Sequence, residues 1–239
     1  MVFENMCEVR EFFPKDEFQP GQTMVVSGRQ KSGKSTFVYD ICNKLEDQVD
    51  MFIAIDDAID MDYSSNTCVY SSWNEDCMDR FLRTQQETWR QYLRRKPTLN
   101  NENGWEPKKG LNICLIIRIN TIPRKVLDSN TYRKMIANNR CKYNLRIVLV
   151  CHNGMDLPPF IRSNATWVFC TKANNEKHLH QVYFTEFEKL KHFTQLFQKI
   201  TPNYTLLGKN KQCTYWWYKV DVNAKQNKEA EFQIIKKFR

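Results

Sequence analysis

The sequence lacks the features that mark membrane and secreted proteins. No stretch approaches the roughly 20 apolar residues that cross a bilayer. The best apolar run, Ile113–Ile117, stops at Arg118. The N-terminal segment carries Glu4, Glu8 and Glu11 and shows no signal-peptide pattern. We therefore expect a soluble, intracellular protein without a membrane span.

Paired cysteine motifs are also missing. The chain has nine cysteines, an odd number, and none of them form a CxxC pair. Several, including Cys114, Cys151 and Cys170, lie within apolar, strand-like runs. This placement predicts buried, reduced thiols, and it argues against a zinc site or a disulfide framework.

Glycine is scarce, with seven residues in 239, but two of them fall in one motif. The segment Gly28–Ser35 reads GRQKSGKS and matches the pattern GxxxxGK[ST]. A β-rich run, Thr23–Ser27, precedes it, and apolar residues at helical spacing follow it in Thr36–Leu45. Strand, glycine loop and helix in this order predict a phosphate site. We expect nine residues to form it: Gly28, Arg29, Gln30, Lys31, Ser32, Gly33, Lys34, Ser35 and Thr36.

The chemistry of phosphate binding explains this spacing. Two glycines let the backbone bend tightly and approach an anion, and consecutive N–H groups then point into one concavity at the positive end of the helix. Lys34 is expected to reach the β- and γ-phosphates, and Ser35 to offer its hydroxyl to Mg²⁺. Thr36 is expected to cap or pack. The alternative is an ordinary Gly/Ser turn with a solvated Lys34.

Apolar strand-like runs alternate with helical patterns along most of the chain. This alternation predicts an α/β domain with a mostly parallel sheet covered by helices on both faces. We expect an N-terminal lead-in over residues 1–22, a core over 23–183, and a small C-terminal extension over 184–239 with a helix, an aromatic strand and a basic tail. The expected strands are Thr23–Ser27, Met51–Ile55, Thr67–Tyr70, Leu111–Ile119, Leu145–Cys151, Thr166–Thr171 and Cys213–Val222. The expected helices are Thr36–Leu45, Asp76–Arg95, Arg124–Asn138 and Thr185–Ile200.

The net charge of +9 is concentrated in the last third of the chain. Residues 170–239 hold 13 basic and 6 acidic side chains, a net charge of +7. Such an excess favours contact with a polyanion. Two alternatives stay open, because a lysine-rich surface also raises solubility and because residue usage also reflects the base composition of a gene.

Two segments of the second half, together with the glycine loop, resemble a known family. Asn138–Cys141 precedes the apolar strand Ile147–Val150, and Leu157–Asn164, which reads LPPFIRSN, follows it. In this order the segments are similar to the poxvirus-type genome-packaging ATPases of nucleocytoplasmic large DNA viruses, a branch of the FtsK/HerA superfamily of P-loop NTPases. The family often has an aromatic strand like Tyr215–Lys219, and the likeness covers roughly residues 20–222.

The resemblance implies a RecA-like fold and an ATPase that drives DNA translocation. It implies that the protein packages a viral double-stranded DNA genome into a capsid as a homo-oligomeric ring, with ATP and Mg²⁺ as cofactors. Double-stranded DNA would be bound without sequence preference, and capsid or portal-vertex proteins are further implied partners. The implied location is the cytoplasm of the host cell, in the viral factory, or the virion.

The chain departs from the family where hydrolysis is concerned. The family's Walker B strand ends in two acidic residues, whereas here Ile119 and Asn120 occupy those positions. Cys141 replaces a family His, and His152 or Asn153 replaces a Gln. Loss of the acidic pair removes the carboxylates expected to hold the Mg²⁺ shell and to orient water. A catalytically impaired nucleotide-binding relative, with a structural or DNA-binding role, is therefore the alternative function. A small-molecule kinase is a third, and Arg90–Arg95 is its only dense arginine cluster.

Four further residues are catalytic candidates. Asp56 and Asp57 end the strand Met51–Ile55 and are expected near the ligand crevice, where they would replace the missing carboxylates; the alternative is an acidic surface loop. The resemblance makes Arg140 and Arg162 candidates for stabilising phosphate charge on a neighbouring subunit. Each has a structural pairing with a carboxylate or a carbonyl as its alternative.

Overall fold

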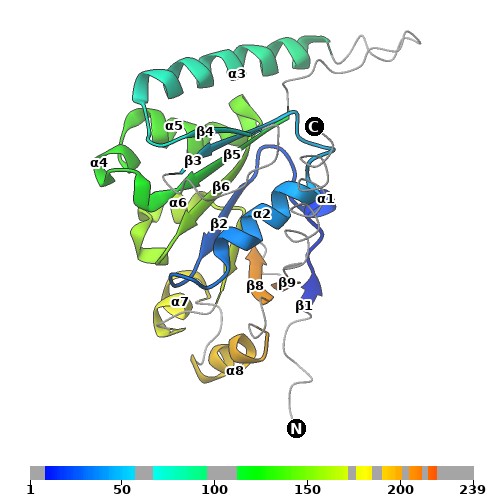
Figure 1. The fold of residues 1–239 in the computed structure, drawn as a ribbon, viewed down its shortest axis with the longest axis vertical. Helices are drawn as coiled ribbons and strands as arrows, with labels where there is room; N and C mark the ends of the chain where they lie inside the picture. The colour runs from blue at the N-terminus through cyan, green and yellow to red at the C-terminus, as the bar shows by residue number, and fades with distance from the viewer. Residues whose placement is uncertain are drawn as a thin grey trace, which may run out of the picture.

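The computed structural model describes residues 9–56, 67–95, 112–171, 176–184, 190–200, 205–211 and 215–219. In this part of the chain the strands form one nine-stranded sheet in the order β1-β9-β8-β7-β2-β6-β5-β3-β4 (Figure 1). The strands are β1 (Val9–Glu11), β2 (Thr23–Ser27), β3 (Met51–Ile55), β4 (Thr67–Tyr70), β5 (Ile113–Arg118), β6 (Arg146–Cys151), β7 (Trp167–Cys170), β8 (Thr205–Asn210) and β9 (Tyr215–Lys219).

The centre of the sheet is parallel, as the apolar runs predict. All neighbours from β7 through β2, β6, β5 and β3 to β4 pair in parallel, and β1 pairs in parallel with β9. Only β8 runs against its two neighbours, β7 and β9. Because β2 and β5 flank β6 and run in the same direction, their carboxyl ends open onto one edge of the sheet.

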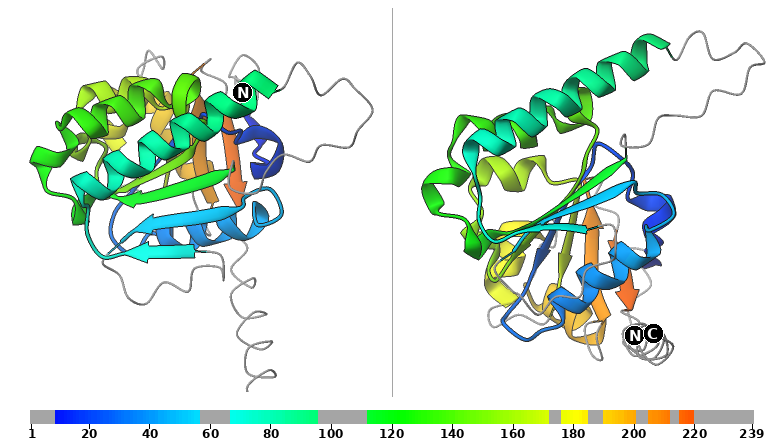
Figure 2. Two further views of the ribbon diagram at one scale, coloured as in Figure 1. Left: turned by 90° about the horizontal axis from the view of Figure 1, so that it is seen from above. Right: turned by 45° about the horizontal axis from the view of Figure 1, so that its top comes forward.

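Helices cover both faces of the sheet (Figures 1 and 2). Side chains alternate along each strand, so Val25 packs in one core and Met24 and Val26 in the other. Helix α2 packs on the second core through Phe37, while α3, α5 and α6 pack on the first. The helices are α1 (Pro14–Glu17), α2 (Lys34–Lys44), α3 (Glu75–Arg95), α4 (Arg124–Leu127), α5 (Asn130–Asn138), α6 (Pro159–Asn164), α7 (Glu176–Tyr183) and α8 (Leu190–Ile200), with short turns at Ile119–Thr121, Asn139–Tyr143 and Gly154–Asp156.

Several elements differ from the sequence-based expectations. The expected helix Arg124–Asn138 is two helices, because Ser129 starts a new one by accepting a hydrogen bond from the Tyr132 amide. Strand β8 and helix α7 were not expected. Part of the 1–22 lead-in is structured, since β1 joins the same sheet as the aromatic strand β9. The expected tail beyond Lys219 lies outside the described residues.

The burial of three cysteines agrees with their placement in apolar, strand-like runs of the sequence. Cys114, Cys151 and Cys170 are buried and free of disulfides, and burial raises the pKa of Cys114 and of Cys151 to about 12. Each helix in the described ranges is too short or too polar to cross a bilayer.

Candidate nucleotide-binding site

The glycine loop joins β2 to α2 at the carboxyl edge of the sheet. Gly28 is required by close approach, because a Cβ there would lie 1.7 Å from the hydroxyl oxygen of Thr171. Gly33 precedes α2 with φ of +88°, a left-handed conformation that glycine adopts without strain, and Lys31 is left-handed as well at +58°. The Ser32 hydroxyl is hydrogen-bonded to that of Thr171, which fastens the loop to the end of β7.

Lys34 lies at the centre of this loop. Its side chain is buried, and Nζ donates hydrogen bonds to the carbonyl oxygens of Gly28 at 2.7 Å and Arg29 at 2.6 Å. Burial lowers the pKa of Lys34 to about 8, and the nearby Arg118 guanidinium acts in the same direction. The ammonium therefore braces the loop and remains mostly protonated at neutral pH. This burial differs from the solvated lysine of the alternative, and phosphate binding by the loop stays a prediction.

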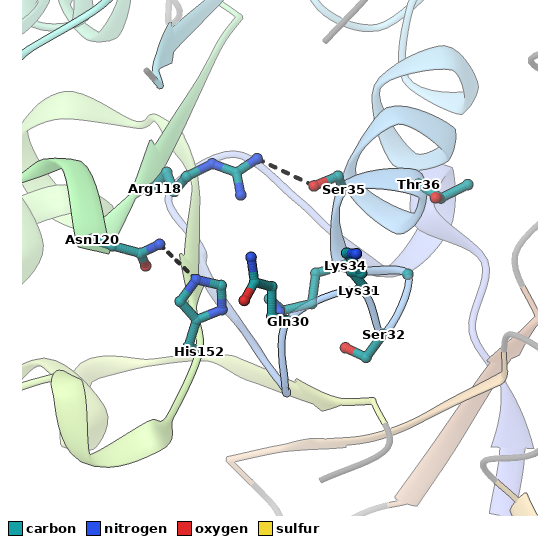
Figure 3. A pocket seen from close by; sticks show the side chains of 10 residues that line it. Gln30, Lys31, Ser32, Lys34, Ser35, Thr36, Arg118, Asn120 and His152 are labelled. Carbon is teal, nitrogen blue, oxygen red and sulfur yellow. Dashed lines mark hydrogen bonds between the residues drawn. The ribbon is translucent and has the colours of Figure 1, made fainter. Parts of the chain in front are cut away.

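A cavity of about 480 Å³ opens beside the loop (Figure 3). This volume lies within the range of small-molecule sites, about 300–1,000 Å³. Seven of the nine predicted phosphate-site residues line it, and the other two, Gly28 and Arg29, supply the carbonyls that hold Lys34. Its lining residues are Gln30, Lys31, Ser32, Gly33, Lys34, Ser35, Thr36, Arg118, Asn120 and His152.

Arg118 is the residue that reaches from β5 to the loop (Figure 3). Its Nη2 donates to the Ser35 hydroxyl at 3.2 Å, and its Nε donates to Asp56 Oδ1 at 2.6 Å. The Asp56 side chain is 2% exposed and that of Arg118 is 15% exposed. Asp56, at the end of β3, thus pairs with a cation and is not among the cavity's lining residues. Asp57 lies outside the described residues.

His152, which follows β6, and Asn120, which follows β5, line the part of the cavity next to these strand ends. Asn120 Nδ2 and His152 Nε2 lie 2.7 Å apart, which orients both side chains toward the loop (Figure 3). Desolvation together with the cations Lys34 and Arg118 lowers the pKa of His152, so its ring is neutral at neutral pH. Ile119 is buried in the core and is not among the residues that line the cavity.

The lining residues suit a polyphosphate, whereas they do not suit Mg²⁺. Three cationic residues, Lys31, Lys34 and Arg118, line the cavity together with loop amides at the start of α2, and no carboxylate is among the lining residues. Magnesium in nucleotide sites usually keeps several waters and is held by one or two carboxylates together with the phosphates of the substrate. Here the Ser35 hydroxyl, the expected magnesium ligand, already accepts a hydrogen bond from a guanidinium. Within the described ranges no three His, Cys, Asp or Glu side chains are grouped to hold a metal.

The two candidate arginines lie outside the cavity of their own chain. Arg140 is exposed and close to Gly21, which precedes β2, at the edge of the sheet opposite the loop. Arg162, in α6, donates to the carbonyl oxygens of Leu157 at 2.8 Å and Gly154 at 3.5 Å. Arg162 thus makes the carbonyl contacts that were expected if its role is structural. A role for either arginine on a neighbouring subunit stays a prediction.

Sequence reasoning missed Arg118. In the sequence Arg118 interrupts an apolar strand, and the family pattern places its two carboxylates at the next two positions. A signal was present, because Arg118 is the one charged residue of the run Ile113–Ile119 and falls directly before the positions of the acidic pair. Its reach to Ser35 follows only from the strand order, in which β6 alone separates β5 from β2.

The strand order and the glycine loop together define the fold of a P-loop NTPase with a RecA-like core. No known family profile matches the chain. Among solved structures it is similar to the genome packaging NTPase B204 from Sulfolobus turreted icosahedral virus 2 in complex with AMP, at 17% identity and a TM-score of 0.56, covering 84% of this chain and 98% of that one.

Two further proteins are similar to this chain, one in structure and one in sequence. The pCW3 conjugation coupling protein TcpA matches with a TM-score of 0.60 at 12% identity, over 90% of this chain and 65% of that one. Among curated proteins, the uncharacterized protein 075L of Invertebrate iridescent virus 6 is 22% identical over 195 residues, which are 78% of this chain and 69% of that protein. At these identities the likenesses to solved structures show the fold alone.

Proposed function

We propose that the protein is a nucleoside-triphosphate-binding component of a viral genome-packaging apparatus. The observation that carries the proposal is the loop between β2 and α2, whose buried Lys34 and left-handed Gly33 frame a cavity of about 480 Å³ lined by cations. Loop amides, a helix N-terminus and a lysine are the groups by which proteins hold a polyphosphate chain. ATP is the expected nucleotide.

The comparisons support the packaging part of the proposal. The B204 structures are described as a genome packaging NTPase in complex with ATP-gammaS and with AMPPCP, and this chain covers 98–99% of their length. The relative from Invertebrate iridescent virus 6 is also a viral protein, which supports a viral origin for this chain. Double-stranded DNA is thus the proposed macromolecular partner, bound by a homo-oligomeric ring at the capsid, in the host-cell cytoplasm or the virion.

Two versions of this function differ in whether the triphosphate is hydrolysed. The first is an ATP-driven DNA translocase, and the likeness to a packaging NTPase over nearly its full length favours it. The second is a nucleotide-binding relative with little turnover, which acts through binding and assembly. The contact of Arg118 with Ser35, in a cavity without a lining carboxylate, favours the second version, and it is the one that the geometry supports best.

Calorimetry with ATP tests the binding step. We expect the wild-type protein to bind ATP, and the Lys34→Ala variant to lose at least tenfold in affinity because a charge-assisted phosphate contact is gone. Lys125→Ala is the matched control, because Lys125 is exposed on α4 away from the cavity. Circular dichroism confirms that each variant is folded. Absence of ATP binding by folded wild-type protein would reject the proposal.

Steady-state hydrolysis measured with and without double-stranded DNA separates the two versions. The second version predicts ATP binding with turnover that DNA does not stimulate. DNA-stimulated turnover that disappears in Lys34→Ala would instead establish the translocase version.

A further inference from the structure

We propose that the guanidinium of Arg118 takes the place of the divalent cation in this site, so that the protein binds nucleoside triphosphate without Mg²⁺. The inference rests on the proposed function, because it concerns how the same cavity holds its ligand. It starts from the position of the side chain: Arg118 ends β5, and its Nη2 lies 3.2 Å from the hydroxyl oxygen that would ligate the metal.

The guanidinium is fixed in this position from two sides. Asp56, almost fully buried at the end of β3, accepts a hydrogen bond from Nε at 2.6 Å, and Ser35 at the start of α2 accepts one from Nη2. Charged hydrogen bonds of this kind are short and directional. The side chain extends from β5 and is held by residues of two other elements, so it is not a mobile surface arginine.

An arginine held in this way can do the electrostatic work of a metal for a polyphosphate. Its charge is permanent, and its planar fork presents five N–H donors whose spacing matches phosphate oxygens. Contacts with Asp56 and Ser35 use two of these donors, and Arg118 lines the cavity together with Lys34, Asn120 and His152. A triphosphate at the loop would then meet the ammonium of Lys34 and the guanidinium of Arg118, both of them cations.

The same geometry opposes a divalent ion. A Mg²⁺ ion bound at about 2 Å to the Ser35 hydroxyl would lie within about 5 Å of a fixed positive charge, because Arg118 Nη2 is 3.2 Å from that oxygen, and like charges at this separation repel in a partly buried site. The carboxylate that could offset this repulsion, Asp56, is already engaged by Arg118. The inference concerns binding, and slow turnover follows from it because the cavity then lacks the ion that neutralises charge as the phosphoryl group transfers.

Calorimetric titration with ATP, performed once in excess EDTA and once in excess Mg²⁺, tests the inference. We expect wild-type protein to bind ATP in EDTA with an affinity within about threefold of that in Mg²⁺. Arg118→Gln should lose at least tenfold in EDTA, since a charge-assisted contact to phosphate is worth that much. Arg133→Gln is the matched control, because Arg133 is exposed on α5 and pairs with Asp128 away from the cavity.

Removal of Arg118 alone leaves Asp56 buried without this partner, so a second variant protects the test against misfolding. The double substitution Asp56→Asn with Arg118→Gln removes both charges of the pair and should show the same loss in EDTA. ATP affinity of wild-type protein that falls tenfold or more in EDTA would overturn the inference and leave the proposed function standing. Failure to bind ATP under both conditions would reject the proposed function itself.

Discussion

Lys34 and Arg118 place two positive charges against one loop before any ligand arrives. Burial lowers the pKa of Lys34 to about 8, and the positive charge of Arg118 acts in the same direction. The structure offsets the cost with the Lys34 hydrogen bonds to loop carbonyls and with the Arg118–Asp56 pair. Such a concentration of charge without a lining carboxylate is typical of a site built for a polyanion.

A pH dependence of ATP affinity follows at the scale of this residue. Lys34 is protonated below pH 8 and loses its proton above it, whereas a bound triphosphate favours the protonated form. Affinity should therefore fall as pH rises through about 8, by up to roughly tenfold per pH unit. The terminal phosphate of ATP is already ionised there, since its pKa is near 6. Calorimetry from about pH 7 to about pH 9.5 measures this. Arg118→Gln should move the pH at which the affinity begins to fall, the break, to a higher value, because Arg118 lowers the pKa of Lys34.

Proton uptake supplies the control for that experiment. Above pH 8 binding should draw a proton from solution, which appears as a dependence of the binding enthalpy on the ionisation enthalpy of the buffer. Lys34→Ala should remove the uptake together with the break. An affinity that stays flat across this range would show that Lys34 does not titrate where burial is expected to place it.

Helix α2, which begins at the phosphate site, is fastened to a strand from the far end of the chain. The hydroxyl of Tyr218, in β9, donates to the buried carboxylate of Asp40 at 2.7 Å. The ring of Tyr218 also packs edge-on against Phe37, and Lys44 lies 4.8 Å above its centroid. The expected C-terminal extension is therefore joined to the core at the helix that carries Lys34.

Loss of the Tyr218 hydroxyl should destabilise the fold measurably. Tyr218→Phe keeps the ring and its contact with Phe37 but removes a donor to a buried carboxylate, so unfolding should become easier by about 1–3 kcal/mol. Urea denaturation followed by circular dichroism measures this. Tyr70→Phe is the control, because Tyr70 is 54% exposed on β4 and should change stability little. Equal urea midpoints for both variants would argue that this hydrogen bond contributes nothing.

Elements that carry their own signal were the ones that the sequence predicted. Strands β2, β3 and β4 begin and end at the expected residues, and α3 starts one residue earlier than expected, because a long apolar run or a helical repeat is a local property. Strand β1 was not predicted, because its three residues are too few to show a periodic pattern and its partner β9 lies about 200 positions away in the sequence. The loop residues were found from their motif, whereas the contact of Arg118 with Ser35 depends on strand order and side-chain direction.

At the scale of the whole molecule, the charge distribution is the property that bears on a DNA partner. The chain carries a net charge of +9, of which +7 belongs to residues 170–239. Strands β8 and β9 and helices α7 and α8 come from this part of the chain, and in the sheet β8 lies beside β7 and β9 lies beside β8. Positive side chains of this kind attract the phosphate backbone of DNA without reading its base sequence.

Double-stranded DNA should bind to the protein through charge, without sequence preference. Affinity should fall steeply with salt, because each phosphate neutralised releases counterions and contributes a slope of about −0.9 in a plot of log affinity against log salt. Fluorescence anisotropy with two duplexes of equal length and unrelated sequence, between about 50 and about 200 mM salt, measures both properties. We expect equal affinities for the two duplexes and a slope of several units. A merely solubilising surface predicts weak binding even at the lowest salt, and a preference for one duplex would point instead to contacts with base edges, which neither the charge pattern nor the fold requires.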